Sequence, residues 1–333
     1  MKQHRGLVLW AVFIALLLVV PLFAGSYFLS IIILIAISIV GATGLNMLTG
    51  YTGEISLGQG AFLAIGAYST ALYGNHLSLP FWLTLPMAGL TVAIVGLIIA
   101  IPAIRLRGLY LAIATFSLQM LVEHVVRNWS LTGKSNGITA PAASFGQFEI
   151  VGEHRFFYLA VIVSGLMVLF AWNVTRSRVG RAWLAIREKD LAAAALGIPV
   201  TFYKIQAYML SSFFAGIAGG LMAYYYGYVA PDFFTLAVSV QYLSMILVGG
   251  MGTIYGSVMG ACFVVLIPEA LRLAANIMPK GLSVNLLELQ QVIYGLLIVM
   301  VILFANKGLA GLWKAISHRV MHRSAYGKLK VDN

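Results

Sequence analysis

About ten runs of mostly apolar residues divide this chain, and each is near the length that crosses a lipid bilayer. Each run is expected to be helical, because in lipid the backbone must satisfy its own hydrogen bonds. Only 9% of the residues are charged, whereas soluble domains carry about 25%. We therefore predict an all-α polytopic membrane protein with about ten transmembrane helices. The predicted spans are 7–24, 27–48, 57–74, 81–102, 109–126, 156–172, 203–227, 236–252, 254–277 and 286–305.

The basic residues predict the orientation of these spans. Lys and Arg favour the cytoplasmic side of a membrane. With the N-terminus inside, the inside segments hold most of the 21 basic residues. Those segments are the N-terminus, 103–108, a short basic segment at about 175–204, and the tail. We predict an N-in, C-in membrane domain over 1–306 and a basic cytoplasmic tail over 307–333. The first run lacks a small-residue cleavage site, so we expect no cleaved signal peptide.

The remaining composition excludes several classes. The net charge of +11 follows from the cytoplasmic bias and from attraction to anionic membrane lipid. The tail contains one aromatic residue, Tyr326, and so offers no row of stacking platforms for nucleic acid bases. Cys262 is the single cysteine, which rules out an internal disulfide. The histidines show no zinc-ligand spacing, so we expect no metal and no cofactor.

An internal energy source is hard to find in the sequence. The nearest fragment of a phosphate-binding loop is Gly133-Lys134-Ser135, but Asn128 stands where the motif needs glycine. We therefore expect no ATPase activity in this chain. Ion-driven carriers place acidic residues deep in their spans. Here Glu123 and Glu269 are each expected to form ion pairs near a span end, with Arg127 and Arg272.

The segment at about 175–204 reads as one or two short helices at the cytoplasmic surface. Ser177 and Asp190 are good N-cap residues for these helices. Gly197 supplies a left-handed stop, and Pro199 prevents the second helix from continuing. Two interpretations stay open: an amphipathic helix held by anionic lipid, or a docking helix for a partner ATPase. The docking interpretation is favoured because the chain has no energy source of its own.

The glycine-rich stretch 50–68 is the best candidate for a substrate path. Its glycines weaken a helix, and transporters often place interrupted helices at substrate sites. Ser56 and Gln59 have the spacing of a capping box. The alternative is close helix packing through small residues such as Gly60 and Gly66. The polar residues of other spans are expected to make interhelical hydrogen bonds; they are Asn46, Gln119, Gln241 and Ser244.

Four stretches together resemble a known family. They are 50–68 (GYTGEISLGQGAFLAIGAY), 105–115 (RLRGLYLAIAT), 132–138 (TGKSNGI), and 177–197 followed by Pro231, Phe234 and 249–252. On these residues the chain resembles an inner-membrane permease subunit of the branched-chain amino acid ABC importer family. The resemblance covers about 45–305. It implies a multi-pass protein of the bacterial inner membrane that forms half of a path for branched-chain or other hydrophobic amino acids.

The resemblance also implies partners. They are a second homologous permease, two cytoplasmic ATPases that hydrolyse the ATP, and a periplasmic or lipid-anchored substrate-binding protein. The outer loop 128–155 could meet that binding protein or serve as a plain connector. Alternatives are a permease for urea, short amides or aromatic acids, an ion-coupled secondary transporter, and a membrane scaffold without transport.

Two sets of site residues are predicted from these arguments. For the translocation path they are Tyr51, Glu54, Ser56, Gln59 and Gly60. For ATPase coupling they are Arg178, Gly180, Arg181, Arg187, Asp190, Ala193 and Gly197. The coupling motif of ABC importers would place a glutamate where this chain has Leu191. We expect a bulky residue at Ala193, or replacement of Gly197, to weaken coupling.

Overall fold

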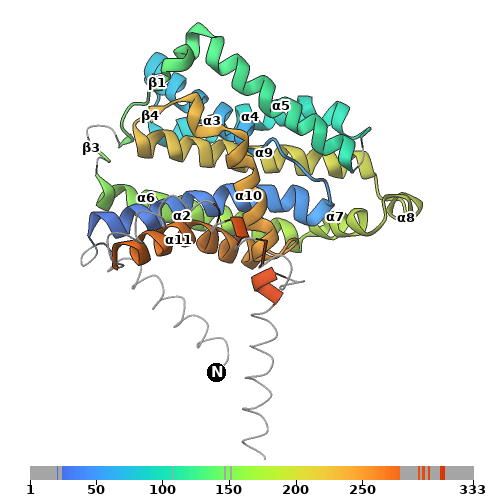
Figure 1. Ribbon diagram of the computed structural model, residues 1–333. Coiled ribbons are helices and arrows are strands. Elements are labelled where there is room, and N and C mark those ends of the chain that lie inside the picture. Colours follow the sequence, from blue (N-terminus) through green and yellow to red (C-terminus); the bar gives the residue numbers. More distant parts are fainter. Residues whose placement is uncertain are drawn as a thin grey trace, which may run out of the picture.

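The computed structural model of the chain is a bundle of long helices (Figure 1). It describes residues 21, 25–106, 108–145, 148–150, 152–277, 292, 295–296, 299–300 and 308–311. The long helices are α2 (Ser26–Leu45), α3 (Gln59–Leu77), α4 (Phe81–Ala103), α5 (Leu109–Asn128), α6 (Glu153–Arg176), α9 (Val200–Tyr226), α10 (Leu236–Gly249) and α11 (Ile254–Ile277). Two short helices, α7 (Arg178–Glu188) and α8 (Asp190–Ala195), lie between α6 and α9.

Helix α9 forms the centre of the bundle. It packs against α3 and α4 on one side and against α2 on the other. In Figure 1, α3, α4 and α5 lie above α9, and α2, α6 and α11 lie below it. Helix α10 crosses between the two groups and packs against α11, α2 and α3. The buried face of α9 is rich in Gly, Ala and Ser, which lets the neighbouring backbones approach closely.

Eight of the ten predicted spans correspond to helices. Seven helical segments are long and apolar enough to cross a membrane; they are Ser26–Tyr51, Phe81–Ala103, Leu109–Asn128, Glu153–Arg176, Val200–Tyr226, Pro231–Gly249 and Ile254–Leu273. Helix α3 has 19 residues but is less apolar and is not among them. The predicted spans 7–24 and 286–305 lie outside the continuously described residues.

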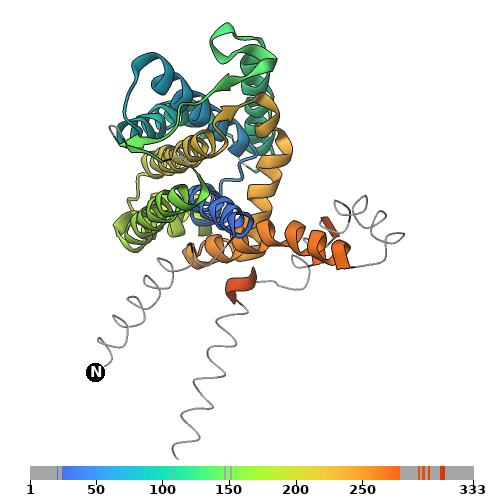
Figure 2. The ribbon, with the colours of Figure 1, turned by 90° about the vertical axis from the view of Figure 1, so that its left-hand side faces the viewer.

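The loops between the helices gather at two opposite ends of the bundle. One end, called here the strand end, carries the paired strands β1 (Ile138–Thr139) and β4 (Tyr228–Val229). In Figure 2 this strand end faces the viewer. The other, the α7–α8 end, carries α7 and α8 together with 46–58 and 250–253 (Figure 1). Gly308 lies against Gly250 at this same end. Three segments that were predicted to lie on one side of the membrane, at about 46–58, 177–199 and 250–253, thus come together at this end.

The strand end holds short strands within an otherwise helical structure, which agrees with the predicted all-α class. The loop from α5 to α6 holds two 3-10 turns, η2 (Ser130–Thr132) and η3 (Lys134–Asn136), and the strands β2 (Ser144–Phe145) and β3 (Phe148–Glu149). β2 pairs with β3 in the loop itself, and β1 reaches β4 after α9. These two-residue strands form because a loop outside the helices must pair its backbone locally.

Of the two ion pairs predicted near span ends, one is formed and the other is not found among the described residues. The predicted Glu123–Arg127 pair is confirmed, with 3.1 Å between Nη2 and Oε1. Arg127 also contacts Asp232 at 2.7 Å, in the 3-10 turn η4 (Pro231–Phe234). The predicted Glu269–Arg272 pair is not found among the described residues. Glu269 instead accepts a hydrogen bond from the Tyr27 hydroxyl, because α2 packs along α11.

Candidate functional site

The short helix α7 begins as predicted and buries its apolar face. Ser177 is the N-cap, and its Oγ accepts a hydrogen bond from the Val179 N–H at 3.1 Å. The Trp183 side chain is fully buried, and its Nε1 donates to the Tyr203 carbonyl of α9 at 2.9 Å. Ile186 is also buried, one turn on. Helix α7 is therefore fastened to the base of α9 and does not lie free on the surface.

Helix α8 ends as predicted, in a left-handed glycine. Gly197 has φ +83°. Its N–H donates to the Ala194 carbonyl at 3.0 Å, and the Ile198 N–H donates to the Ala193 carbonyl at 3.1 Å. This pair of bonds is the Schellman motif, which satisfies carbonyls at a helix end.

The beginning of α8 corrects a prediction. Lys189 occupies the N-cap position of α8, and Asp190 is the first helical residue. The Asp190 carboxylate does not cap the helix; its Oδ2 lies 2.8 Å from the Lys204 Nζ on α9. An ammonium group inside the bundle is a stronger partner for a carboxylate than a surface backbone amide.

Lys204 is the centre of a buried ionic group. The residue is 4% exposed, and its Nζ contacts both Asp190 and the Glu54 Oε1, the latter at 2.5 Å. Glu54 is 7% exposed and belongs to the irregular segment 52–58 between α2 and α3. We call Glu54, Lys204 and Asp190 the ionic triad. It joins three separate parts of the chain: the irregular segment, α9 and α8.

The irregular segment follows a break in the helix that starts at α2. Residues Asn46–Tyr51 form a π-helical turn, η1, and such turns are frequent at functional sites. Gly53 then takes φ +78°, which glycine allows at no steric cost. The Arg187 side chain of α7 packs against Gly53, and its Nη1 donates to the Gly50 carbonyl at 2.5 Å.

Asn46 ties this break to the loop between α10 and α11. Its Nδ2 donates to the Thr253 carbonyl at 2.8 Å and to the Ser257 Oγ at 2.7 Å. Its Oδ1 accepts from the Gly252 N–H at 2.9 Å. The predicted interhelical role of Asn46 is confirmed. Gln119 also reaches another element, since its Nε2 donates to the Phe234 carbonyl at 2.6 Å. Ser244 does not, because its hydroxyl donates to Val240 within α10.

The predicted capping box of Ser56 and Gln59 at the start of α3 is not formed. Gly58 is the N-cap of this helix and makes no side-chain cap bond. The Ser56 Oγ accepts from the Gly58 N–H at 3.3 Å, and the Gln59 Nε2 donates to the Gly41 carbonyl of α2 at 3.0 Å. Gln59 points toward α2 because α3 packs beside it, so it cannot fold back over its own helix end.

All five predicted path residues are buried within this chain. They are Tyr51, Glu54, Ser56, Gln59 and Gly60. Gly60 lies close to the Ser239 hydroxyl, which accepts from its N–H at 2.8 Å. The structure thus uses these residues in close packing between elements. Their part in a translocation path stays a prediction.

The predicted coupling residues divide into buried and exposed sets. Gly180 lies against the Thr175 backbone, and Ala193 is 1% exposed, so neither offers an outward surface. A bulky residue at Ala193 would therefore disturb packing inside the chain before it met a partner. Arg178, Arg181, Arg187 and Gly197 are exposed, and Asp190 is partly buried.

Two exposed leucines of this region were not predicted as site residues. Leu191 is 77% exposed and Leu196 is 80% exposed, at the two ends of α8. Together they place two large apolar side chains at the surface of this short helix. Their spacing of five residues around a small-residue run was visible in the sequence, but not which face of α8 the bundle covers.

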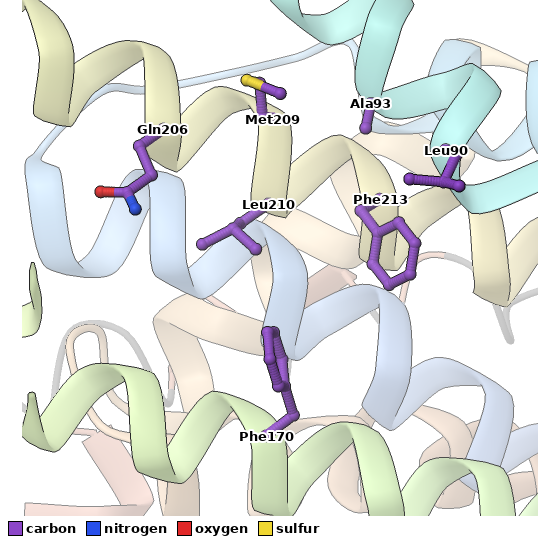
Figure 3. Close-up of a pocket in the computed structure, with 7 residues that line it drawn as sticks. All are labelled: Leu90, Ala93, Phe170, Gln206, Met209, Leu210 and Phe213. Carbon is purple, nitrogen blue, oxygen red and sulfur yellow. The ribbon is translucent and has the colours of Figure 1, made fainter. Parts of the chain in front are cut away.

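An apolar groove lies farther along the bundle, between α4, α6 and α9 (Figure 3). It has a volume of about 350 Å³ and is lined by Leu90, Ala93, Phe170, Gln206, Met209, Leu210 and Phe213. Its lining is almost entirely apolar, and Gln206 supplies the polar end. None of the predicted path or coupling residues lines this groove.

Comparisons with known proteins give the chain its class and its family. The bundle of long apolar helices with a folded polar end is that of a multi-pass membrane protein. A family model described as the permease component of the branched-chain amino acid transport system matches residues 27–302. The chain belongs to this family. No solved structure shows a significant match to it.

Three curated relatives carry the likeness in detail. The high-affinity branched-chain amino acid transport system permease protein LivM of Salmonella typhimurium is 35% identical over 261 residues, which cover 71% of this chain and 61% of the relative. LivM of Escherichia coli gives the same identity and coverage. The permease protein LivH of the Escherichia coli system is 28% identical over 70% of this chain and 80% of its own length. The matched region thus spans about three fifths of the LivM relatives.

Proposed function

We propose that this chain is a permease subunit of an ATP-driven importer and forms half of the path for branched-chain or other hydrophobic amino acids. The family match over 27–302 carries this proposal. The chain would sit in the inner membrane of a bacterium, with N- and C-termini inside, ten crossings, a permease domain over 1–306 and a basic tail over 307–333. The gathering of the described loops at two opposite ends supports the alternation of crossings.

The partners follow from the same comparison. LivM and LivH of Escherichia coli are both named as permease proteins of one transport system, and both resemble this chain. We propose that it pairs with a second permease of this kind, and that two ATPases and a substrate-binding protein complete the importer. ATP hydrolysis would belong to the ATPases, and substrate selection to the binding protein.

The α7–α8 end is the proposed docking site for an ATPase. It presents the exposed Leu191 and Leu196 of the α8 region and the exposed cations Arg178 and Arg181 of α7. An apolar anchor with a charged rim is the usual composition of a protein interface. Helix α7 is fixed to α9 through Trp183, so a force on this end would reach the transmembrane helices.

The proposal is tested by reconstitution in proteoliposomes. The chain, its neighbouring permease, both ATPases and the binding protein should import leucine only when ATP is present. Leucine uptake by this chain alone, driven by an ion gradient, would overturn the proposal. Uptake of urea or of aromatic acids in place of leucine would keep the class and change the substrate.

The docking site has its own test. The double variant Leu191→Asp and Leu196→Asp should reduce the ATPase that co-purifies with the permease, because it places charge in the apolar anchor. Truncating a strong anchor residue typically costs about 2 kcal/mol or more, which is roughly 30-fold in affinity. Leu77→Asp is the matched control, since Leu77 is 57% exposed at the opposite end. Full ATPase binding by the double variant would exclude α8 as the docking element.

A further inference from the structure

We infer that Lys204 is a positioning residue that couples α8 to the irregular segment 52–58, through the ionic triad it forms with Asp190 and Glu54. This inference rests on the proposed function and names the residues that would carry force from the docked ATPase into the membrane domain. The triad brings together one residue predicted for coupling and one predicted for the path, through a third that the sequence did not single out.

Few side chains of α8 pack against the rest of the chain. Most residues of α8 are exposed, and Ala193 is its one buried residue. Among the residues that the structure describes, the ionic contact of α8 with the bundle is that of Asp190, whose Oδ2 lies 2.8 Å from the Lys204 Nζ. A displacement of α8 by a partner would therefore act on Lys204 or break this contact.

The segment on the other side of Lys204 is the part of the bundle best suited to move. Residues 53–57 form no helix, although they lie between a π-helical turn and α3. The segment is held by specific polar contacts. Thr49 Oγ1 donates to the Glu54 carbonyl at 3.0 Å, and the Leu57 N–H donates to the Thr115 Oγ1 of α5 at 3.0 Å. A segment held by such polar contacts, in place of a helical hydrogen-bond ladder, can rearrange by exchanging them.

A second contact runs in parallel with the triad. Arg187, at the end of α7, donates to the Gly50 carbonyl, just before the irregular segment. The segment is thus held on both sides of Gly53: by Arg187 of α7 at Gly50, and by Lys204 at Glu54. Gly53 itself has φ +78°, and the chain turns there. In the triad Lys204 and Glu54 are buried and Asp190 is partly buried, whereas Arg187 is exposed. A buried ionic contact is screened by salt much less than an exposed one, so we take the triad as the main link.

A merely stabilising ion pair would behave differently from a coupling device. Removing a stabilising pair would lower the amount of folded complex and all its activities together. Removing a coupling contact would leave assembly and basal ATP hydrolysis intact and lower the number of leucine molecules imported per ATP hydrolysed. The stoichiometry of transport is therefore the readout that separates the two roles.

The experiment uses the full importer in proteoliposomes and three variants of this chain. Asp190→Asn cuts the triad at α8. The double variant Glu54→Gln and Lys204→Met removes its inner pair without leaving a lone buried charge. The triple variant combines all three changes. Asp232→Asn is the matched control, because it removes a carboxylate 2.7 Å from Arg127 at the strand end.

We expect the first two variants to lower leucine import per ATP at least about fivefold, the lower range of allosteric coupling between sites. The triple variant should lose no more than the double variant, because residues of one path are not additive. Basal ATP hydrolysis should be unchanged, and Asp232→Asn should match the wild type. Wild-type stoichiometry in the variants, or independent losses that multiply in the triple variant, would overturn the inference.

A distance measurement tests the same inference without leucine. In a Cys262→Ser background, spin labels at the exposed Ile55 and Leu77 report the irregular segment against the far end of α3. A second pair at the exposed Ala194 and Leu77 reports α8 itself. In the full importer, ATP should shift both distances in the wild type and only the α8 distance in the variants. An Ile55 distance that ATP does not change, or that still shifts in the variants, would overturn the inference. A wild-type chain that binds no ATPase would overturn the proposed function itself.

Discussion

At the scale of single residues, buried polar side chains decide how the breaks in the helices are held. Asn46 is fully buried and satisfies groups of Gly252, Thr253 and Ser257 at once. In this position the side chain replaces the backbone bonds that the π-helical turn and the loop at 250–253 leave open. Loss of one partner leaves a buried polar group unsatisfied, which costs more than the bond itself contributes.

Replacing Asn46 by leucine should therefore destabilise the protein. The Gly252 N–H and the Ser257 hydroxyl would lose their partner, at about 1–3 kcal/mol for each unsatisfied group. The thermal unfolding midpoint in detergent measures the effect. Asn128→Ala is the control, because Asn128 is exposed and bonds only its own helix through the His124 carbonyl. Equal midpoints for the two variants would refute the role of Asn46.

Gly197 makes a second prediction at this scale. A side chain at φ +83° costs about 1–2 kcal/mol, although nothing lies within 4 Å of the added Cβ. Gly197→Ala should therefore speed amide hydrogen exchange at the Gly197 and Ile198 N–H groups roughly 5- to 30-fold. Gly197→Asn should have a smaller effect, because asparagine tolerates the left-handed region. Unchanged exchange in Gly197→Ala would show that the Schellman end does not hold α8.

At the scale of elements, close approach through glycine sets how α3 packs on α9. A Cβ on Gly219 would overlap the Leu63 carbonyl oxygen, and one on Gly66 would overlap the Gly216 backbone. The packing alternative proposed for Gly66 is thereby supported.

Gly219→Ala should destabilise the bundle through this contact. Overpacking of a close-packed site costs about 1–3 kcal/mol, and here the obstacle is backbone that cannot rotate away. Gly165→Ala in α6 is the matched control, since nothing lies within 4 Å of its added Cβ. It should be neutral, or more stable by up to about 1 kcal/mol. Thermal unfolding in detergent compares the two, and a midpoint for Gly219→Ala at or above the wild type would contradict the packing argument.

At the scale of the whole molecule, the two ends of the bundle should face opposite sides of the membrane. The α7–α8 end carries the basic residues that favour the cytoplasm. In a Cys262→Ser background, Ser130→Cys at the strand end should react with an impermeant maleimide in intact cells. Lys189→Cys, between α7 and α8, should react only after the membrane is opened. Both positions are exposed, so access is set by the side of the membrane. The reverse labelling would invert the proposed topology.

Much of the local structure could be predicted from the sequence. The apolar runs gave the helices between 25 and 277 with small errors at their ends, because length and apolar content fix a transmembrane helix without reference to its neighbours. The cap at Ser177 and the stop at Gly197 were also predictable, because a cap depends on backbone groups within a few residues. The capping roles of Asp190 and Gln59 were wrong, because each side chain found a partner distant in sequence.

The sequence by itself determined the class, the family and the order of helices and breaks, since these depend on composition and on short-range patterns. Only the tertiary structure decided that Asp190, Lys204 and Glu54 meet, that Gly180 and Ala193 face inward, and that Leu191 and Leu196 face outward. The reason is physical. Which face of a helix is covered depends on how the whole bundle packs, and a buried lysine takes its partners from whatever carboxylates that packing brings within reach.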